Sequence, residues 1–371
     1  MTTQRRNFLK TAALGAGIVA SGAMATGGCD KKSEIKAQVA KNPGPQKRNM
    51  CGFRAEPIPT VRVGIVGLGM RGGGAVGRLS KIPGCKIVAL CDLRPEKVKN
   101  AVARLNKDAK SPPAPKSSAL YSGEEGWKAM CERDDLDLIY ICTPWRWHTP
   151  MAVYAMKNGK HAATEVPAAT TIDEAWELVN TSEATGKHCV ILENCCYDFF
   201  EMMTLNMARQ GAFGDVMYGE GAYIHQLVGL NFSQKGYQGM WRLNQNFTKD
   251  GNLYPTHGFG PVAQIMNINR GDRLDFISSQ STADVTMFEE AKKRAAKDAF
   301  YKPYAKNQYR GQMNNTMVKT KNGKSILIQH DVSSPRPYSR IHLVSGTKGI
   351  ARKWPSQKIA LSGHKFETQD D

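Results

Sequence analysis

The chain has 371 residues, of which 41% are hydrophobic and 23% are charged, so it is long enough for two soluble domains with sizeable cores. Its formal net charge of +18 arises partly near the N-terminus, because residues 1–48 contain nine Lys and Arg against two Asp and Glu. The remaining basic charge is spread out, apart from one stretch at 289–311, and no RNA-binding pattern of interleaved aromatic residues accompanies it. We therefore expect a solvated basic surface and no nucleic-acid partner.

The first 29 residues have the features of an export signal. Arg5 and Arg6 lie in the segment QRRNFLK, which resembles the twin-arginine consensus, and the Ala- and Gly-rich stretch after it is too weakly apolar for a membrane span. We expect residues 1–29 to direct export by the twin-arginine translocase to the periplasm or cell envelope, and residues 30–59 to form a linker. Cys29 follows an imperfect lipobox, so lipidation of Cys29 and cleavage to a soluble periplasmic protein are both open.

The nine cysteines do not form a recognisable metal or disulfide pattern. They include no CxxC pair and no His/Cys cluster with zinc spacing. Twin-arginine substrates are exported already folded, so buried cysteines would remain thiols. We expect neither a metal site nor a disulfide framework.

The stretch TVRVGIVGLGMRGGG joins a β-rich run to a G-x-G-x-x-G sequence formed by Gly67, Gly69 and Gly72. Glycines at these positions permit a tight strand-to-helix turn and let a pyrophosphate approach the helix N-terminus. A second strand, CKIVALCD, ends in Asp92, whose carboxylate can bind a ribose 2′-OH and repels a 2′-phosphate. The pattern predicts a site for NAD rather than NADP; a glycine-rich turn without a ligand is the alternative.

A third strand, LDLIYI, reads as a buried parallel strand that ends at Thr143-Pro144. Ligands bind beyond the carboxyl ends of such strands. We therefore expect Trp145 and Trp147 to line the nicotinamide or the sugar, although a packing role for one of them is the alternative. His148 follows four residues after the proline.

Two further elements are expected to bring polar residues to the same edge. The helical segment MAVYAMKNGKH and a short strand lead to Glu165. A helix follows in TIDEAWELVNTSEATGKH, with Gly186 suited to its end, and the strand CVILEN carries Glu193 and Asn194 to that edge.

The glycine motif, Asp92, Thr143-Pro144 with His148, and Glu165-x-Pro167 together resemble the Gfo/Idh/MocA oxidoreductase family. The resemblance implies an α/β fold in two domains: an NAD-binding Rossmann domain with a doubly wound parallel sheet over residues 60–195, and a C-terminal substrate domain with a large, open, mostly antiparallel sheet over 196–371. The second half agrees with this. GDVMYGEGAYIH alternates like a strand, a hairpin is predicted with its turn at Asn322-Gly323, and a second hairpin is predicted in SRIHLVSGTKGIARKW.

Two residues depart from the sugar dehydrogenases of that family, which use a Lys in Glu-Lys-Pro and an Asp-x-x-x-His. Val166 stands at the lysine position, and Leu253 stands four residues before His257. Aliphatic side chains cannot perform general acid–base catalysis, which typically contributes about 10²–10⁴-fold in rate. The usual alcohol dehydrogenase mechanism is therefore disfavoured.

A narrower resemblance accounts for these departures. The segments TPWRWH, TEVPAATTIDEAWELV, EGAYIH and NLYPTHGFGPVAQIMNINRGDR, with the twin-arginine leader, closely resemble glycoside hydrolase family 109, in which Glu-Val-Pro is the normal form. These are NAD-dependent α-N-acetylgalactosaminidases. The resemblance runs from about Val61 to the region of Arg336–Tyr338. Family members continue past the residue at which this chain stops, so we expect a shortened C-terminal domain.

Carried over residue by residue, the resemblance implies a cofactor site and an adjoining sugar site. The expected NAD contacts are Gly67, Gly69, Met70, Arg71, Gly72, Asp92, Trp145, Arg146, Trp147, His148, Glu165, Val166, Asn194 and Tyr254. The expected sugar contacts are Tyr223, Arg242, Tyr254, Pro255, Thr256, His257 and Tyr338.

The implied reaction is a redox-neutral hydrolysis of a glycan or glycoside. NAD⁺ takes a hydride from the sugar C3, a base removes the acidified C2 proton, the aglycone leaves C1, water adds, and the hydride returns. His257 and Tyr254 are the expected catalytic residues, because histidine titrates near neutrality and the pKa of a tyrosine beside NAD⁺ can be lowered. Which of them is base and which is acid stays open, as do a structural role for His257 and a packing role for Tyr254. Glu165 is expected to orient the cofactor or sugar hydroxyls.

The export signal agrees with this chemistry. Because the periplasm offers no NAD pool, the cofactor must be tightly bound and recycled in each turnover. Two alternatives remain: a periplasmic sugar oxidoreductase that moves hydride between two sugars, and a non-catalytic, NAD-containing sugar-binding protein. An exposed face on the open sheet leads us to expect a homodimer.

Overall fold

The structure is a computed structural model that describes residues 46–107, 112–363 and 365–366, all within one compact unit. The expected export signal with Arg5 and Arg6, the candidate lipidation residue Cys29 and most of the expected linker lie outside the described residues. The described part of that linker forms no helix or strand. The side chain of Gln46 and the N–H of Lys47 donate hydrogen bonds to Glu183 at 3.1 Å each.

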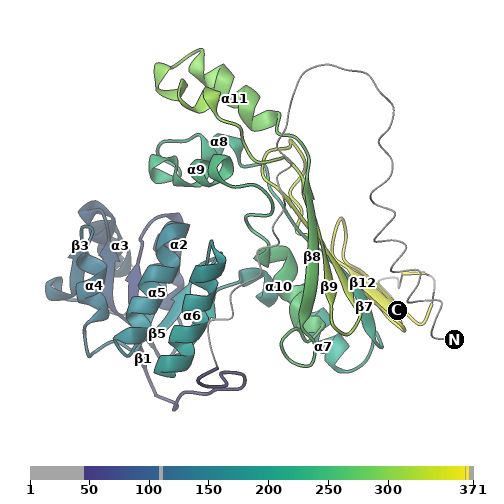
Figure 1. Cartoon of the computed structure of the whole chain (residues 1–371). Coiled ribbons are helices and arrows are strands. Elements are labelled where there is room, and N and C mark those ends of the chain that lie inside the picture. The colour runs from purple at the N-terminus through teal and green to yellow at the C-terminus, as the bar shows by residue number, and fades with distance from the viewer. Residues whose placement is uncertain (1–45, 108–111, 364, 367–371) are drawn as a thin grey trace. The chain divides into compact units, whose positions relative to one another are not determined.

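Six parallel strands form the first sheet, in the order β3-β2-β1-β4-β5-β6 (Figure 1). They are β1 (Val61–Val66), β2 (Cys85–Asp92), β3 (Leu120–Ser122), β4 (Leu138–Ile141), β5 (His161–Thr164) and β6 (Cys189–Ile191). The intervening helices are α2 (Met70–Leu79), α3 (Pro95–Lys107), α4 (Gly126–Cys131), α5 (His148–Lys157) and α6 (Ile172–Thr185), with the short turns η1 (Ser117–Ala119) and η2 (Trp145–Trp147). The reversal of strand order at β1 and β4 is that of a doubly wound sheet, so the predicted Rossmann fold is confirmed.

Local sequence explains the limits of α6. The Thr171 hydroxyl accepts a hydrogen bond from the N–H of Glu174, and the Glu174 carboxylate accepts one from the N–H of Thr171, which completes a capping box. Gly186 ends the helix with a φ of +64°, a left-handed conformation that glycine adopts without strain. The predicted helix is therefore confirmed at both ends.

Seven strands form the second sheet, in the order β13-β12-β11-β7-β10-β9-β8. They are β7 (Val216–Ile224), β8 (Leu274–Ser281), β9 (Asn314–Thr320), β10 (Ser325–Asp331), β11 (His342–Gly346), β12 (Gly349–Arg352) and β13 (Lys358–Leu361). All neighbouring pairs are antiparallel except β7 and β10. Both predicted hairpins are present: β9 and β10 meet at a turn containing Asn322 and Gly323, and β11 pairs with β12.

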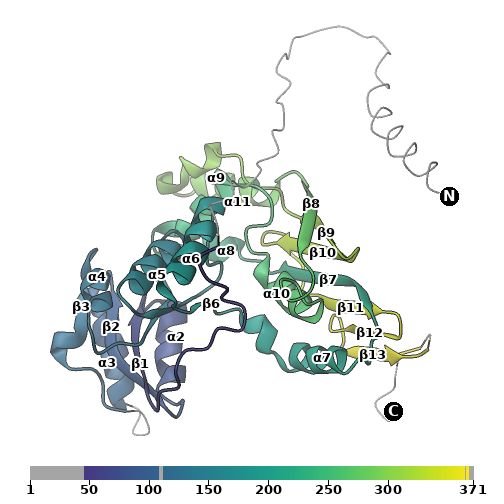
Figure 2. The same cartoon turned by 60° about the horizontal axis from the view of Figure 1, so that its bottom comes forward.

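The helix α10 (Thr256–Ile265) lies against this sheet across β7 (Figures 1 and 2). Two glycines make the approach close. A Cβ on Gly221 would lie 2.2 Å from the carbonyl oxygen of Gly258, and a Cβ on Gly258 would lie 2.5 Å from the backbone nitrogen of Ala222. This contact fixes the start of α10, which contains His257, beside Tyr223 on β7.

The other elements complete the second half of the chain. They are η3 (Asn194–Tyr197), α7 (Phe199–Arg209), α8 (Val228–Asn231), η4 (Gln238–Met240), α9 (Trp241–Thr248), α11 (Thr286–Ala295), η5 (Ala299–Tyr301) and η6 (Tyr304–Lys306). Within the described ranges, none of the helices combines the length and apolar character that a membrane crossing requires.

Candidate active site

The turn between β1 and α2 depends on close backbone packing. Gly67 has a φ of +84°, and a Cβ on Gly72 would lie 1.8 Å from the carbonyl oxygen of Gly67, so only glycine fits at Gly72. A Cβ on Gly69, in contrast, would meet no atom within 4 Å, which leaves open space at the N-terminus of α2. The nearby hydroxyl of Thr143 is buried without a hydrogen-bond partner among the described residues. Open space in front of helix N–H groups suits a pyrophosphate, so these residues fit a dinucleotide.

Asp92 ends β2 with its carboxylate at the same turn. One oxygen accepts a hydrogen bond from the N–H of Leu68 at 2.6 Å, and the other accepts one from the N–H of Arg94 at 3.0 Å. The Arg94 guanidinium lies 3.8 Å from the carboxylate and also donates to Gln238. Asp92 therefore lies where ribose binding would require it, and Arg94 adds a cation that the sequence did not lead us to assign.

Arg71 connects three elements at the carboxyl edge of the first sheet. Its Nη2 lies 3.4 Å from Glu165 Oε2, after β5, and 3.3 Å from Asn194 Oδ1, in η3. Glu165 is buried, whereas Met70, the residue before Arg71, is exposed. The structure thus brings together three of the expected cofactor residues.

The two tryptophans of η2 lie in different surroundings. Trp145 is buried and stacks on Tyr254, with ring centroids 5.7 Å apart and an interplanar angle of 29°. Trp147 is partly exposed and packs near Trp127, in the core of the first half, with Arg146 over its ring. Of the two, Trp145 adjoins the expected sugar residues.

His148 and Val166 are both buried. The His148 ring nitrogens lie 2.7 Å from the carbonyl oxygens of Pro167 and Thr143, so its polar atoms face the protein backbone. Burial lowers its pKa, although both carbonyls act to raise it. Val166 packs in the same apolar cluster as Trp145, Tyr223 and Tyr254.

A buried cation lies among aromatic rings beside Tyr254. The guanidinium carbon of Arg242 is 5.0 Å from the centroid of Tyr254 and 5.1 Å from that of Trp145, and Arg242 Nη1 donates to the hydroxyl of Tyr237 at 2.9 Å. Burial raises the pKa of Tyr254, and Arg242 opposes this rise. The side chains around Tyr254 therefore do not by themselves produce the lowered pKa that we expected; burial dominates.

His257 is paired with a carboxylate from the first sheet. Its Nδ1 lies 2.7 Å from Oε1 of Glu193, which also accepts a hydrogen bond from the N–H of Cys195. Burial would raise the pKa of Glu193, but the hydrogen bond and charge of His257 outweigh it and lower that pKa. Glu193 therefore remains a carboxylate that orients the imidazole. The His257 ring also meets the Tyr254 ring edge-on at 4.7 Å.

Tyr223, on β7, packs against both Tyr254 and His257. Its ring contacts those of Tyr254 and His257 at centroid distances of 5.0 Å each. Its hydroxyl lies 2.8 Å from Nδ1 of His225, whose ring meets that of Tyr338 at 4.8 Å. The expected sugar residues of β7, α9, α10 and the segment before β11 thus converge. Pro255 and Thr256 complete the group at the start of α10.

Three residues beside these had no assigned role in the sequence. Glu193 was placed at the correct edge but only Asn194 was assigned there, and His225 lay unassigned in the EGAYIH segment. His330 pairs with Tyr223 across β10 and β7, and both its ring nitrogens are buried without a partner among the described residues. The two-residue spacing of Tyr223 and His225, which in an extended segment directs both side chains to the same side, is the signal that could have identified His225 just after β7.

Glu193, Cys195 and His257 could in principle bind a metal ion, since their ligand atoms all lie within 4.8 Å of one another. The chemistry of the thiol disfavours this. Burial raises the pKa of Cys195 to about 12, and Arg340 Nη1 lies 2.8 Å from its sulfur. The residues suit a hydrogen-bonded proton-transfer pair better than a metal centre.

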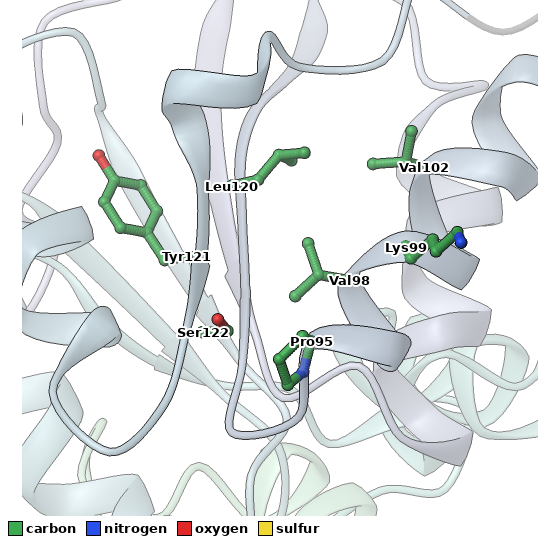
Figure 3. Close-up of a pocket in the computed structure, with 7 residues that line it drawn as sticks. All are labelled: Pro95, Val98, Lys99, Val102, Leu120, Tyr121 and Ser122. Carbon is green, nitrogen blue, oxygen red and sulfur yellow. The ribbon is translucent and has the colours of Figure 1, made fainter.

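An open hollow of about 300 Å³ lies elsewhere, beside α3 and the edge strand β3 (Figure 3). Its lining is mainly apolar: Pro95, Val98, Lys99, Val102, Leu120, Tyr121 and Ser122. None of the expected catalytic or sugar residues contributes to it. It therefore lies outside the candidate site.

Comparisons with known proteins match both halves of the chain. Residues 61–193 match the oxidoreductase family with an NAD-binding Rossmann fold, and residues 197–370 match the C-terminal domain of glycosyl hydrolase 109. An alpha-N-acetylgalactosaminidase from Bacteroides fragilis is 48% identical over 321 residues, which are 85% of this chain and 74% of that protein. A glycosyl hydrolase family 109 protein from Solibacter usitatus is 44% identical over 372 residues, covering 99% of this chain and 79% of that protein.

Solved structures share the fold at low sequence identity. An aldose-aldose oxidoreductase from Caulobacter crescentus, complexed with glycerol, has a TM-score of 0.62 and 18% identity, covering 83% of each chain. A scyllo-inositol dehydrogenase from Lactobacillus casei with bound NAD(H) has a TM-score of 0.57 and 15% identity, covering 80% of this chain and 76% of the other. The two-sheet architecture is therefore that of these oxidoreductases.

Proposed function

This chain belongs to glycosyl hydrolase family 109, and we propose that it is a glycosidase that releases terminal α-linked N-acetylgalactosamine by an NAD-dependent, redox-neutral cycle. The substrate is inferred from the alpha-N-acetylgalactosaminidase that is 48% identical to it. The observation that carries the mechanism is the His257–Glu193 pair, which lies edge-on to Tyr254 beside the carboxyl edge of the Rossmann sheet. The aliphatic Val166 lies in the same cluster.

The cofactor would be held by the glycine turn, Asp92 and the group formed by Arg71, Glu165 and Asn194. When bound, NAD supplies a hydride acceptor that is reduced and reoxidised within one turnover. Trp145 stacks on Tyr254 and meets Trp241 edge-on, so its aromatic contacts link the cofactor half to the sugar half. These contacts would exclude water from the reacting sugar.

The protons are moved by side chains of the second half. With Nδ1–H donated to Glu193, the neutral His257 presents Nε2 as a proton acceptor. Burial keeps the Tyr254 hydroxyl protonated, so this residue does not serve as the base. We therefore assign the basic role to His257 and the acidic role to Tyr254, the latter toward the departing aglycone oxygen.

The sugar would be held by hydrogen-bond donors around these two residues. Arg242 is buried, and its contacts within the described part of the chain are with aromatic side chains rather than with a carboxylate. Its remaining N–H groups can therefore donate to sugar oxygens. Tyr223, Thr256 and Tyr338 add hydroxyls on the same side.

We further propose that the protein is exported folded, with its cofactor tightly bound and recycled, and acts in the periplasm or on a lipid anchor at Cys29. The twin-arginine segment containing Arg5 and Arg6 supports this, because export in a folded state permits loading of NAD before translocation. A homodimer through the open face of the second sheet is part of the same proposal.

The purified protein should release p-nitrophenol from p-nitrophenyl α-N-acetylgalactosaminide without added NAD⁺ or metal. His257→Ala and Tyr254→Phe should each reduce kcat by about 10²–10⁴-fold, the usual contribution of general acid–base catalysis. Accumulation of bound NADH with one sugar, discharged by a second sugar, would instead establish an oxidoreductase. Sugar binding with no turnover of any aryl glycoside would establish a binding protein.

A further inference from the structure

An arginine beside Asp92 reaches across to the second half of the chain. Arg94 follows β2, and its guanidinium lies 3.8 Å from the carboxylate of Asp92, the group that would bind the ribose of NAD. Nη1 of Arg94 donates a hydrogen bond to Oε1 of Gln238, which lies in η4, 144 residues away in sequence. None of the proton or hydride transfers proposed for the site involves this contact. It joins the adenosine end of the cofactor site to the part of the chain that contains the expected sugar residues.

The backbone after Gln238 makes an uncommon turn. Gly239 has a φ of +65° and Met240 a φ of +50°, both in the left-handed region. Glycine adopts this conformation without strain, whereas methionine rarely does. Met240 is held there because its side chain is buried in the apolar cluster of Trp145 and Tyr254. Gln238, in contrast, stays exposed, so packing of the turn in the core presents its amide to Arg94.

The same segment is attached to the sugar site at its other end. The Tyr237 hydroxyl accepts a hydrogen bond from Arg242 at 2.9 Å, and the Tyr237 ring meets that of Trp241 at 5.3 Å. Trp241 in turn meets Trp145 edge-on at 5.4 Å. Residues 237–242 therefore form a strap that runs from Arg94 to the aromatic group around the expected sugar residues.

The groups at the adenosine end keep hydrogen-bonding capacity for a ligand. The Asp92 carboxylate accepts the N–H groups of Leu68 and Arg94, and a carboxylate has further acceptor positions that ribose hydroxyls can use. The guanidinium of Arg94 carries several N–H donors, and its hydrogen bond to Gln238 uses one of them. The others can donate to oxygens of a bound dinucleotide. Gln238 fixes the direction in which they point.

We propose that Arg94 closes over the adenosine end of bound NAD and that Gln238, carried by the strap, holds Arg94 in this closed position. NAD that is bound at Asp92 must pass Arg94 to dissociate, so the hydrogen bond between Arg94 and Gln238 slows its release. Gln238 is thus a positioning residue that acts through Arg94. The inference rests on the proposed function, in which NAD stays bound through repeated turnovers.

The test is the dissociation of radiolabelled NAD⁺ from the loaded full-length protein in an excess of unlabelled NAD⁺. Gln238→Ala should raise the dissociation rate about tenfold, the scale of a hydrogen bond to a charged group. Arg94→Ala should raise it at least as much, and the double variant should be no faster than Arg94→Ala, because Gln238 acts only through Arg94. Gln238→Glu, whose carboxylate still accepts from Arg94, should keep the slow wild-type rate.

Activity gives a second readout. Freshly loaded Gln238→Ala should have the wild-type kcat, but its activity should decay after dilution into buffer without NAD⁺ and return when NAD⁺ is added. Gln234→Ala is the matched control, because Gln234 is an exposed glutamine just before the strap, and it should behave as the wild type in both assays. Equal dissociation rates in Gln238→Ala and the wild type, or additive effects in the double variant, would overturn the clasp. A wild type that retains NAD⁺ but hydrolyses no aryl glycoside would overturn the proposed function alone.

Discussion

Glu193 Oε1 lies 2.7 Å from Nδ1 of His257, so a carboxylate that follows the last strand of the Rossmann sheet orients a histidine at the start of α10. The carboxylate fixes the tautomer of the ring and stabilises the imidazolium that forms when Nε2 accepts a proton. His257 lowers the pKa of Glu193 in spite of burial, so Glu193 remains ionised beside the ring.

Glu193→Gln keeps the size of the side chain but removes this charge. We expect kcat to fall about 10²-fold with a smaller change in KM, because the imidazolium is no longer stabilised. Steady-state kinetics on an aryl glycoside measures this. Glu183→Gln is the matched control, since Glu183 is a buried carboxylate on α6 whose partners, within the described part of the chain, are Gln46 and the N–H of Lys47. Equal losses in the two variants would mean that the charge acts on the fold rather than on His257.

Local patterns were sufficient for much of the fold. The glycine turn, the capped helix α6 and the hairpin at Asn322-Gly323 each depend on residues a few positions apart, and each is present. The strand β8 was not predicted. Seven of its eight residues are exposed, so it shows no alternation of buried and exposed side chains.

Local sequence patterns do not predict the contacts between distant segments that form the candidate site. Glu193 and His257 are 64 residues apart in sequence, and they meet because Gly221 and Gly258 let α10 approach β7 closely. That approach is a property of packing between distant segments. Residues close in sequence can also separate in space: Trp145 is buried in the apolar cluster of Tyr254, whereas Trp147 is exposed and lies near Trp127.

Arg242 is expected to determine sugar affinity. Its guanidinium lies over Trp145, Tyr237 and Tyr254, a planar arrangement that the compact ammonium of a lysine cannot reproduce. Arg242→Lys should therefore raise KM about tenfold, within the range of a desolvated cation–π contact, and affect kcat less. Arg294→Lys is the control, because Arg294 lies over Phe232 and Tyr301 in a comparable way but outside the site. A larger effect on kcat than on KM would assign Arg242 to the chemical step.

Two glycines of the β1–α2 turn should respond differently to alanine. Gly72→Ala places a Cβ 1.8 Å from a carbonyl oxygen, so the turn must distort and Tm should fall. Gly69 has an extended conformation with φ −69° and open space around its Cβ, so Gly69→Ala should keep the wild-type Tm of cofactor-free protein. Because the added methyl enters the space assigned to pyrophosphate, NAD affinity, measured by fluorescence titration, should fall. Unchanged affinity in Gly69→Ala would place the phosphates elsewhere.

Val166→Lys tests whether the aliphatic residue marks a lost dehydrogenase. Val166 is 3% exposed in an apolar cluster with Trp145, Tyr223 and Tyr254, where an ammonium group would be desolvated. We expect lower Tm and no gain in activity. Val166→Leu, which adds volume without charge, separates crowding from desolvation. Higher turnover with Val166→Lys, accompanied by release of oxidised sugar, would favour the dehydrogenase mechanism.

The buried His342 on β11 should make stability depend on pH. Burial, with a further contribution from Lys353, lowers its pKa from 6.5 to about 4. The unfolded chain therefore binds a proton at His342 near pH 6.5, whereas the folded chain binds it only near pH 4. The contribution of His342 to the free energy of unfolding is constant above this window and falls by ~3 kcal/mol as pH drops through it. Urea denaturation of His342→Asn between pH 7 and 4 should show a flatter slope. Thr204→Val, which removes the hydroxyl 3.0 Å from Nε2 but keeps the imidazole, should lower stability at every pH and retain the slope. If His342→Asn also retains the wild-type dependence of unfolding free energy on pH, a group other than His342 is responsible for it.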